Sequence, residues 1–254
     1  MSEVERVHIL RLTEEGKTSA DDVVVREFPL TIVLNNQELV TLLCSPQNLD
    51  YLAVGFLLSQ GLIKEGDDIK KIIVDEKRGM AQVETKNAVD ISMSPVLASS
   101  GARGTVSSSI KKVSADNKIK LSASRIFSLM EDFAQRSRLF RSTGGVHSAA
   151  LCDANSILLF SEDIGRHNAI DKIFGECILT DIPTDGRILV TSGRVSSEIL
   201  LKAAKRNIPL LISRSAPTDL GVKLAEDLGI TLIGFVRGKR MNVYANDWRI
   251  VSHG

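Results

Sequence analysis

Apolar residues along the chain recur at strand-like and at helix-like spacing, and the order in which these two patterns occur changes near residue 98. In residues 30–34 apolar side chains alternate with their neighbours, then Asn35 and Asn36 follow, and a second apolar run covers 39–43. Two such runs around a pair of asparagines predict a β-hairpin.

A helix is expected directly after this hairpin. Ser45 can cap its start, and Pro46 suits the first helical position. Apolar residues recur at helical spacing from Leu49 to Leu57, and Gly61 can end the helix. Further apolar runs at 69–74, 80–85 and 89–93 predict three strands. The first part of the chain is therefore predicted to be a small α+β domain, covering 1–97.

The next segment lies between the two parts of the chain that differ in this order. Residues 98–109 read ASSGARGTVSSS, which is rich in serine and glycine. Such a composition is typical of a flexible loop or linker. We place this linker at 98–118 and expect a second, larger domain over 119–254.

The second domain alternates strands with helices. Ser122 can cap a first helix, and strand-like runs follow at 188–190, 210–212 and 232–236. Two amphipathic segments lie between these runs, and the second can end at Gly229. This alternation predicts an α/β domain with βαβ units and a parallel sheet.

Cationic and small polar residues follow each of the three predicted strands. Ligands of open α/β sheets bind at the carboxyl ends of the strands, where helix N-termini favour anions and arginine suits phosphate oxygens. We therefore expect an anion or phosphate pocket there. The residues concerned are Ser192, Gly193, Arg194, Ser213, Arg214, Ser215, Arg237, Gly238, Lys239 and Arg240.

The segment 143–172 is the densest in titratable groups beside glycines, and it suits a pocket for a polar ligand. A metal site is not indicated for His147 and His167, because the Cys-x-x-Cys pair and the His-x-Glu of zinc deaminases are absent. The Walker A and Gly-x-Gly-x-x-Gly nucleotide patterns are absent too. His167 has two open interpretations, a backbone hydrogen bond at a strand-to-helix turn and a ligand contact.

Composition narrows the class of protein. The net charge of +1 gives no overall field toward nucleic acid or membrane, so any anion site must be local. Three cysteines, Cys44, Cys152 and Cys177, show no disulfide spacing and are predicted to be buried thiols. No signal peptide or transmembrane run is visible, and a reducing cytoplasm is expected.

Several motifs in order resemble one family. Six segments carry the likeness: EFPLTIVLNN, SPQNLDYLAVGFLLSQGLI, TGGVH, EDIGRHNAIDK, TSGR and SAPTDLGVKLAEDLGITLIGFVRGKRMNVY. Together they resemble the motifs of the FdhD family, the formate dehydrogenase accessory proteins. The likeness covers roughly 26–250.

This resemblance implies a function. Family members look like sulfur carriers, which accept sulfur from a cysteine desulfurase as a cysteine persulfide. They pass it to the bis(molybdopterin guanine dinucleotide) molybdenum cofactor before that cofactor enters formate dehydrogenase. The resemblance also implies that the larger domain is similar to the cytidine deaminase fold without its zinc, in three layers, and that a homodimer forms.

It further implies where the cofactor binds. The family's cofactor-binding motif corresponds to Phe235, Val236, Arg237, Gly238, Lys239 and Arg240. Around it we expect a pocket for the nucleotide ends of the cofactor, with GDP as a surrogate ligand. Besides the strand-end residues, His147, Asp163, Arg166, His167 and Asn168 are expected to help line this pocket.

One departure concerns the sulfur. The family normally has a cysteine, often a Cys-x-x-Cys pair, in the loop between the domains. In this chain the paired form falls on Ser100 and Arg103, and the single-cysteine form falls on Ala102. None of these side chains can form a persulfide, which needs a thiolate. Three functions are therefore weighed: a sulfur carrier, a sulfurtransferase if active; a non-catalytic cofactor chaperone; and a nucleotide hydrolase or deaminase, which the zinc and glutamate pattern disfavours.

Overall fold

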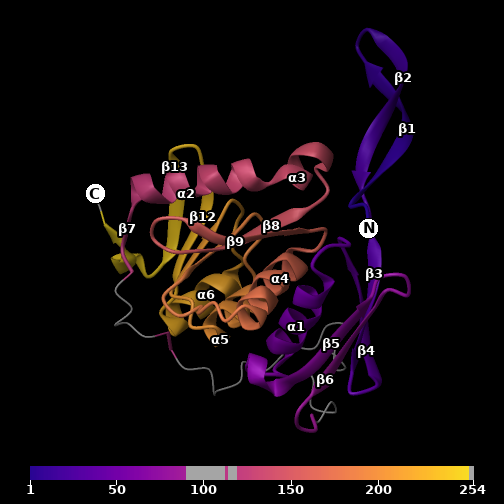
Figure 1. The fold of residues 1–254 in the computed structure, drawn as a ribbon. Helices are drawn as coiled ribbons and strands as arrows, with labels where there is room; N and C mark the ends of the chain where they lie inside the picture. The colour runs from indigo at the N-terminus through magenta and orange to yellow at the C-terminus, as the bar shows by residue number, and fades with distance from the viewer. Residues whose placement is uncertain (90–111, 114–118, 252–254) are drawn as a thin grey trace.

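The computed structural model describes residues 1–89, 112–113 and 119–251. It opens with a hairpin that the sequence analysis did not predict. Strands β1 (Val4–Thr13) and β2 (Gly16–Val25) pair along their whole length and project from the body of the molecule (Figure 1). Their apolar residues are interspersed with charges, so no alternating pattern marks them.

The predicted hairpin after it is confirmed. Strands β3 (Phe28–Leu34) and β4 (Gln37–Cys44) join through Asn35 and Asn36, which have φ of 49° and 67°. Positive φ at both turn residues matches the right-handed twist of the strands. The strands β5 (Ile69–Asp75) and β6 (Met80–Thr85), also predicted, complete a sheet in the order β4-β3-β6-β5.

The first helix begins later than expected. Helix α1 (Leu49–Gln60) has Asn48 as its N-cap, so the prediction of a cap at Ser45 was wrong. The reason is tertiary: the Ser45 hydroxyl accepts from the Ile164 backbone N–H at 3.2 Å, and its own N–H donates to Asp163. The helix ends as predicted at Gly61, which has φ of 77°.

The larger unit is built on a six-stranded sheet in the order β13-β12-β11-β10-β8-β9. Its three central strands, β10 (Ile188–Thr191), β11 (Leu210–Ser213) and β12 (Thr231–Arg237), are parallel, as predicted. The outer strands β8 (His147–Cys152), β9 (Ile157–Asp163) and β13 (Arg240–Ala245) are antiparallel to their neighbours. The expectation of a parallel sheet is thus corrected to a mixed one. Short strands β7 (Leu121–Ser122) and β14 (Ile250–Val251) pair separately.

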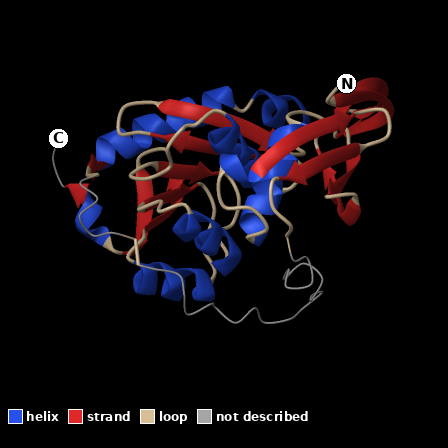
Figure 2. Cartoon of the chain, turned by 60° about the horizontal axis from the view of Figure 1, so that its bottom comes forward, coloured by secondary structure: helices blue, strands red, loops and turns tan. Residues whose placement is uncertain are grey.

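Helices cover both faces of this sheet (Figure 2). Helix α2 (Ala123–Arg136), capped by Ser122 as predicted, packs its apolar side on one face and continues into α3 (Arg138–Thr143). Helices α4 (Arg166–Leu179), α5 (Ser197–Lys205) and α6 (Asp219–Leu228) cover the other, and Gly229 ends α6 as predicted. The mixed α/β class is therefore confirmed.

The two units meet where α1 crosses α4. A Cβ atom on Gly55 would lie 1.8 Å from the Asp171 carbonyl oxygen, and one on Gly175 would lie 1.9 Å from that of Tyr51. The two backbones therefore approach each other through glycine. One continuous apolar cluster includes residues of β3, α1, α4 and the larger sheet.

Two further predictions fall largely outside the described residues. These are the strand at 89–93, of which Val89 alone is described, and the linker at 98–118, of which Lys112 and Val113 are described. Val113 is buried, and its N–H donates to the Leu228 carbonyl at 2.9 Å. The division into domains at this linker stays a prediction.

Candidate functional site: a pocket at the strand ends

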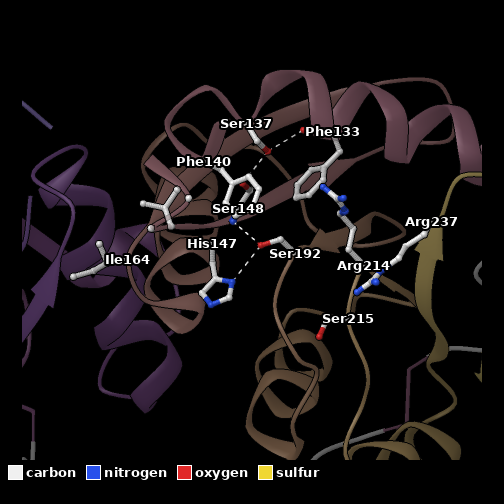
Figure 3. A pocket seen from close by; sticks show the side chains of 13 residues that line it. Phe133, Ser137, Phe140, His147, Ser148, Ile164, Ser192, Arg214, Ser215 and Arg237 are labelled. Atoms are coloured by element: carbon white, nitrogen blue, oxygen red, sulfur yellow. Dashed lines mark hydrogen bonds between the residues drawn. The ribbon is translucent and has the colours of Figure 1, made fainter. Parts of the chain in front are cut away.

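A cavity of about 480 Å³ opens at the carboxyl ends of the parallel strands β10, β11 and β12 (Figure 3). Strand β8 runs antiparallel to β10, so its first residues reach the same edge of the sheet. The lining residues come from α2, α3, β8, β12 and the connecting turns. They are Phe133, Ser137, Phe140, Gly144, Gly145, Val146, His147, Ser148, Ile164, Ser192, Arg214, Ser215 and Arg237.

His147 is positioned by a serine pair. The Ser148 backbone N–H donates to Ser192 Oγ at 2.9 Å, and His147 Nδ1 lies 3.3 Å from the same oxygen. Which atom donates in the second contact depends on the tautomer of His147: with the ring proton on Nε2, Ser192 Oγ donates to Nδ1.

The electrostatic setting of His147 is cationic. Burial lowers the pKa of His147, and the charges of Arg166 and Arg194 lower it further, while Asp163 acts in the opposite direction. Arg214 and Arg237 add two more positive charges to the cavity wall, and in Figure 3 they lie across the pocket from Ile164. The lowered pKa favours the neutral form of the His147 ring. The positive charges of the arginines make the cavity as a whole favourable for an anion.

Two phenylalanine side chains also line the pocket, and the sequence analysis did not predict them there. Phe133 is buried and packs edge-on against Phe160, whereas Phe140 is 42% exposed at the mouth of the cavity. Glu162 fixes α3 by accepting from the N–H groups of Leu139 and Phe140, at 3.0 Å each. Phe140 lies among the arginines and serines of 136–143, and this isolated aromatic residue could have indicated an aromatic pocket wall.

The turns after the strands are tied to one another. Ser213 Oγ donates to the Gly193 carbonyl at 2.7 Å and accepts from the Ser215 N–H at 2.9 Å. The Phe235 N–H donates to the Ser215 carbonyl at 3.1 Å, with Phe235 at a φ of 53° inside β12. These bonds hold Arg214 and Arg237 at one edge.

Other predicted site residues lie behind the cavity wall. Asp163 is fully buried and forms an ion pair with Lys172 at 2.7 Å, and it accepts from Asn168 Nδ2 and the Ser45 N–H. These contacts join the end of β4 to α4. Arg166 packs against Gly193, where a Cβ would lie 2.8 Å from Arg166 Cβ.

The remaining predicted residues also lie outside the lining set. His167 Nε2 is 3.5 Å from Glu198 on α5, so it faces a neighbouring helix. Eight other predicted residues lie in or beside the turns at the strand ends but do not line the cavity. They are Gly193, Arg194, Ser213, Phe235, Val236, Gly238, Lys239 and Arg240. Their contacts with a ligand stay a prediction.

The three cysteines are buried thiols, as expected. Their exposed fractions are 0% for Cys44, 0% for Cys152 and 2% for Cys177. Burial raises the pKa of each to about 12. Sulfur uptake needs an accessible thiolate, and burial with a raised pKa disfavours this state for each of the three thiols.

Two kinds of feature are absent from the described residues. Among them no group of three or more His, Cys, Asp and Glu side chains is arranged to hold a metal ion. Within the same part of the chain, no helix is both long and apolar enough to cross a membrane.

Comparison with known proteins identifies the family. The model of the FdhD/NarQ family matches residues 25–251, so this chain belongs to the FdhD/NarQ family. It is 43% identical to the sulfur carrier protein FdhD of Bacillus pumilus (strain SAFR-032) over 258 residues, 98% of each chain. It is also 43% identical to the sulfur carrier protein FdhD of Bacillus subtilis (strain 168), over 93% of this chain and 94% of the relative.

A solved structure agrees with the fold. A protein of Desulfotalea psychrophila, provisionally described as a formate dehydrogenase accessory protein, matches with a TM-score of 0.83 and 28% identity. The match covers 98% of this chain and 100% of that one. The resemblance to the formate dehydrogenase accessory proteins is therefore confirmed.

Proposed function

We propose that this protein is a sulfur carrier that serves formate dehydrogenase by binding its molybdenum cofactor, with a guanine nucleotide end of the cofactor in the strand-end pocket. The observation that supports this most is that the pocket wall combines cationic and aromatic side chains. Arg214 and Arg237 provide forked donors for phosphate, and Phe140 provides a flat apolar surface for a base.

The size of the pocket supports the same ligand. A cavity of about 480 Å³ lies within the range of small-molecule sites, roughly 300–1,000 Å³. Further parts of the proposal are a cysteine desulfurase and formate dehydrogenase as partners, a cytoplasmic location, and two domains joined at 98–118. The mixed sheet with helices on both faces supports a deaminase-like architecture for the larger domain.

Titration calorimetry with GDP tests the pocket. Replacing Arg214 or Arg237 with alanine removes a charged donor from the wall, and we expect each change to weaken GDP binding by about tenfold or more. Lys223→Ala is the control, because Lys223 is an exposed cation on α6 that lies outside the lining set and outside the predicted cofactor-binding residues. Equal affinities in all four proteins, or no binding by the wild-type chain, would contradict the proposed ligand.

A second candidate function is that of a cofactor chaperone that carries no sulfur on its own chain. The burial of all three thiols favours it, as does the absence of a cysteine at Ser100, Ala102 and Arg103, which lie outside the described residues. In this version another protein's thiol brings the sulfur, and this chain holds the cofactor.

Mass spectrometry separates the two candidates. After incubation with a cysteine desulfurase and cysteine, a sulfur carrier should gain persulfide mass on one of its own thiols, whereas a chaperone with inaccessible thiols should gain none. Ala102→Cys and Ser100→Cys are the positive controls, since each places a thiol where the family has one. A persulfide on Cys44, Cys152 or Cys177 of the folded wild-type chain would return the carrier function to this protein.

A further inference from the structure

Among the described residues that line the cavity, His147 alone can change its charge near neutral pH. An unperturbed histidine titrates near about 6.5, whereas the guanidinium groups of Arg214 and Arg237 keep their charge. The charge of the cavity wall is therefore fixed except at His147. A proton on this ring adds a positive charge to a pocket that we expect to hold phosphate.

Cations surround the His147 ring from several elements. Burial lowers the pKa of His147, and the charges of Arg166 at the start of α4 and of Arg194 after β10 lower it further. Arg214 and Arg237 line the same cavity. Together these charges oppose a proton on the ring as long as no anion offsets them.

The acidic groups near the ring do not cancel this effect. Asp163 on β9 is the register partner of His147, and its charge raises the pKa of that ring. Asp163 is fully buried, however, and Lys172 Nζ lies 2.7 Å from its carboxylate, so most of its charge is already offset. Three further charged groups lie on the neighbouring elements. They are Glu162 on β9, whose carboxylate accepts from two N–H groups of α3, and the exposed Arg138 and Arg141 on α3.

Ser192 lets the ring change its protonation state without losing a hydrogen bond. Ser192 Oγ lies 3.3 Å from His147 Nδ1 and accepts from the Ser148 N–H at 2.9 Å (Figure 3). With the ring neutral and its proton on Nε2, the Ser192 hydroxyl donates to Nδ1. A protonated ring donates from Nδ1 to Ser192 Oγ instead, which frees the hydroxyl proton for a ligand. From the other neutral tautomer, protonation adds the Nε2–H, so either route provides one more donor.

We propose that the pocket takes up its anionic ligand together with a proton, which His147 binds from the solvent. The negative charge of the phosphate offsets the surrounding cations, and the charged ring and the Ser192 hydroxyl then provide donors for its oxygens. The coupling rests on the proposed function, because it needs an anion in this pocket. The complex binds more protons than the free protein, so the ligand is held more tightly as the pH falls from 8 to 6. By reciprocity, loss of the proton loosens the bound anion.

The other histidines of the described residues do not share this role. His167 lies 3.5 Å from Glu198 on α5, and burial lowers its pKa to about 4, so it stays neutral between pH 8 and 6. His8 is an exposed residue of the β1–β2 hairpin and lies outside the lining set. His8→Gln is therefore the matched control for His147→Gln.

Titration calorimetry with GDP and with inorganic pyrophosphate measures the coupling. At pH 7 the binding heats in buffers of different ionisation enthalpy give the number of protons taken up. A terminal phosphate itself titrates near about pH 6, so the wild type is compared with His147→Gln, in which the ligand titrates in the same way. We expect the wild type and His8→Gln to take up a larger fraction of a proton than His147→Gln, with both ligands. The ratio of wild-type to His147→Gln affinity should rise by about fivefold or more from pH 8 to pH 6.

Proton NMR of the wild-type chain gives a second readout, which a loss of packing in the variant cannot mimic. The resonance of the His147 ring, assigned by its absence in His147→Gln, should titrate at a higher pH with pyrophosphate bound than without it.

The outcomes separate the coupling from the proposed ligand. Equal proton uptake by the wild type and His147→Gln, or a His147 ring that titrates at the same pH with and without pyrophosphate, would overturn the coupling and leave the ligand unaffected. Extra proton uptake with pyrophosphate but no binding of GDP would support the coupling and contradict the nucleotide. Binding of neither compound would overturn both.

Discussion

Asp163 and Lys172 connect segments that are far apart in the sequence. Asp163 accepts from Ser45, 118 residues earlier, and Lys172 Nζ donates to the carbonyls of Ser45 and Glu162, at 3.1 and 3.4 Å. Glu162 in turn fixes α3, which contributes Phe140 to the pocket wall. At the scale of single residues, a buried pair with several hydrogen bonds thus links the small unit to the site.

His167 gives a pH dependence of stability. Burial lowers its pKa to about 4, and the charges of Lys202 and Arg166 act in the same direction. The carboxylate of Glu198, 73% exposed, is too well solvated to offset this. In the unfolded chain a histidine titrates near about 6.5, so the unfolded state binds more protons between about pH 6.5 and 4. Stability is therefore lost as the pH falls through this window.

The expected size of this loss can be measured with a variant. Between pH 7.5 and 5.0 the His167 contribution to the free energy of unfolding should fall by about 2 kcal/mol, and His167→Gln should remove that part of the decline. Urea unfolding at both pH values gives the difference. His8→Gln, at an exposed histidine of the hairpin, is the control and should decline like the wild type. A parallel decline in His167→Gln would contradict the assignment.

At the scale of elements, the crossing of α1 and α4 depends on glycine. Gly55→Ala and Gly175→Ala each place a Cβ less than 2 Å from a backbone oxygen of the facing helix, which must move. Although alanine favours a helix, we expect each change to lower the free energy of unfolding by about 3 kcal/mol or more. Denaturant unfolding checks this, with Asp132→Ala at an exposed position of α2 as control. Variants as stable as the wild type would show that the helices can separate at no cost.

Local patterns predicted the β3–β4 hairpin, β5, β6 and the three parallel strands near their true bounds, whereas no bounds were predicted for β8, β9 and α4. The turn at Asn35 and Asn36 and the ends at Gly61 and Gly229 follow from the φ that these residues adopt readily. The start of α1 does not follow from its own sequence, because Ser45 is engaged by β9 and the turn after it. The β1–β2 hairpin has no core face, so hydrophobic periodicity could not indicate it.

At the scale of the whole molecule, the residues of the site lie at one edge of the larger sheet. The carboxyl ends of β10, β11 and β12 meet the start of β8 there, and α3 closes one side. The base of the β1–β2 hairpin lies on the same rim, through Val25 and Gly145.

The sequence alone determined the family, the alternation of strands and helices, and the cationic strand ends, since these depend on residue type and on spacing along the chain. It also showed that the loop contains no cysteine. The tertiary structure decided which polar residues face the cavity. It turned His147, Arg214 and Arg237 toward the pocket and buried Asp163 with Lys172. The direction in which a side chain points and its burial depend on the packing of segments that are distant in the sequence. Local sequence patterns therefore do not predict them.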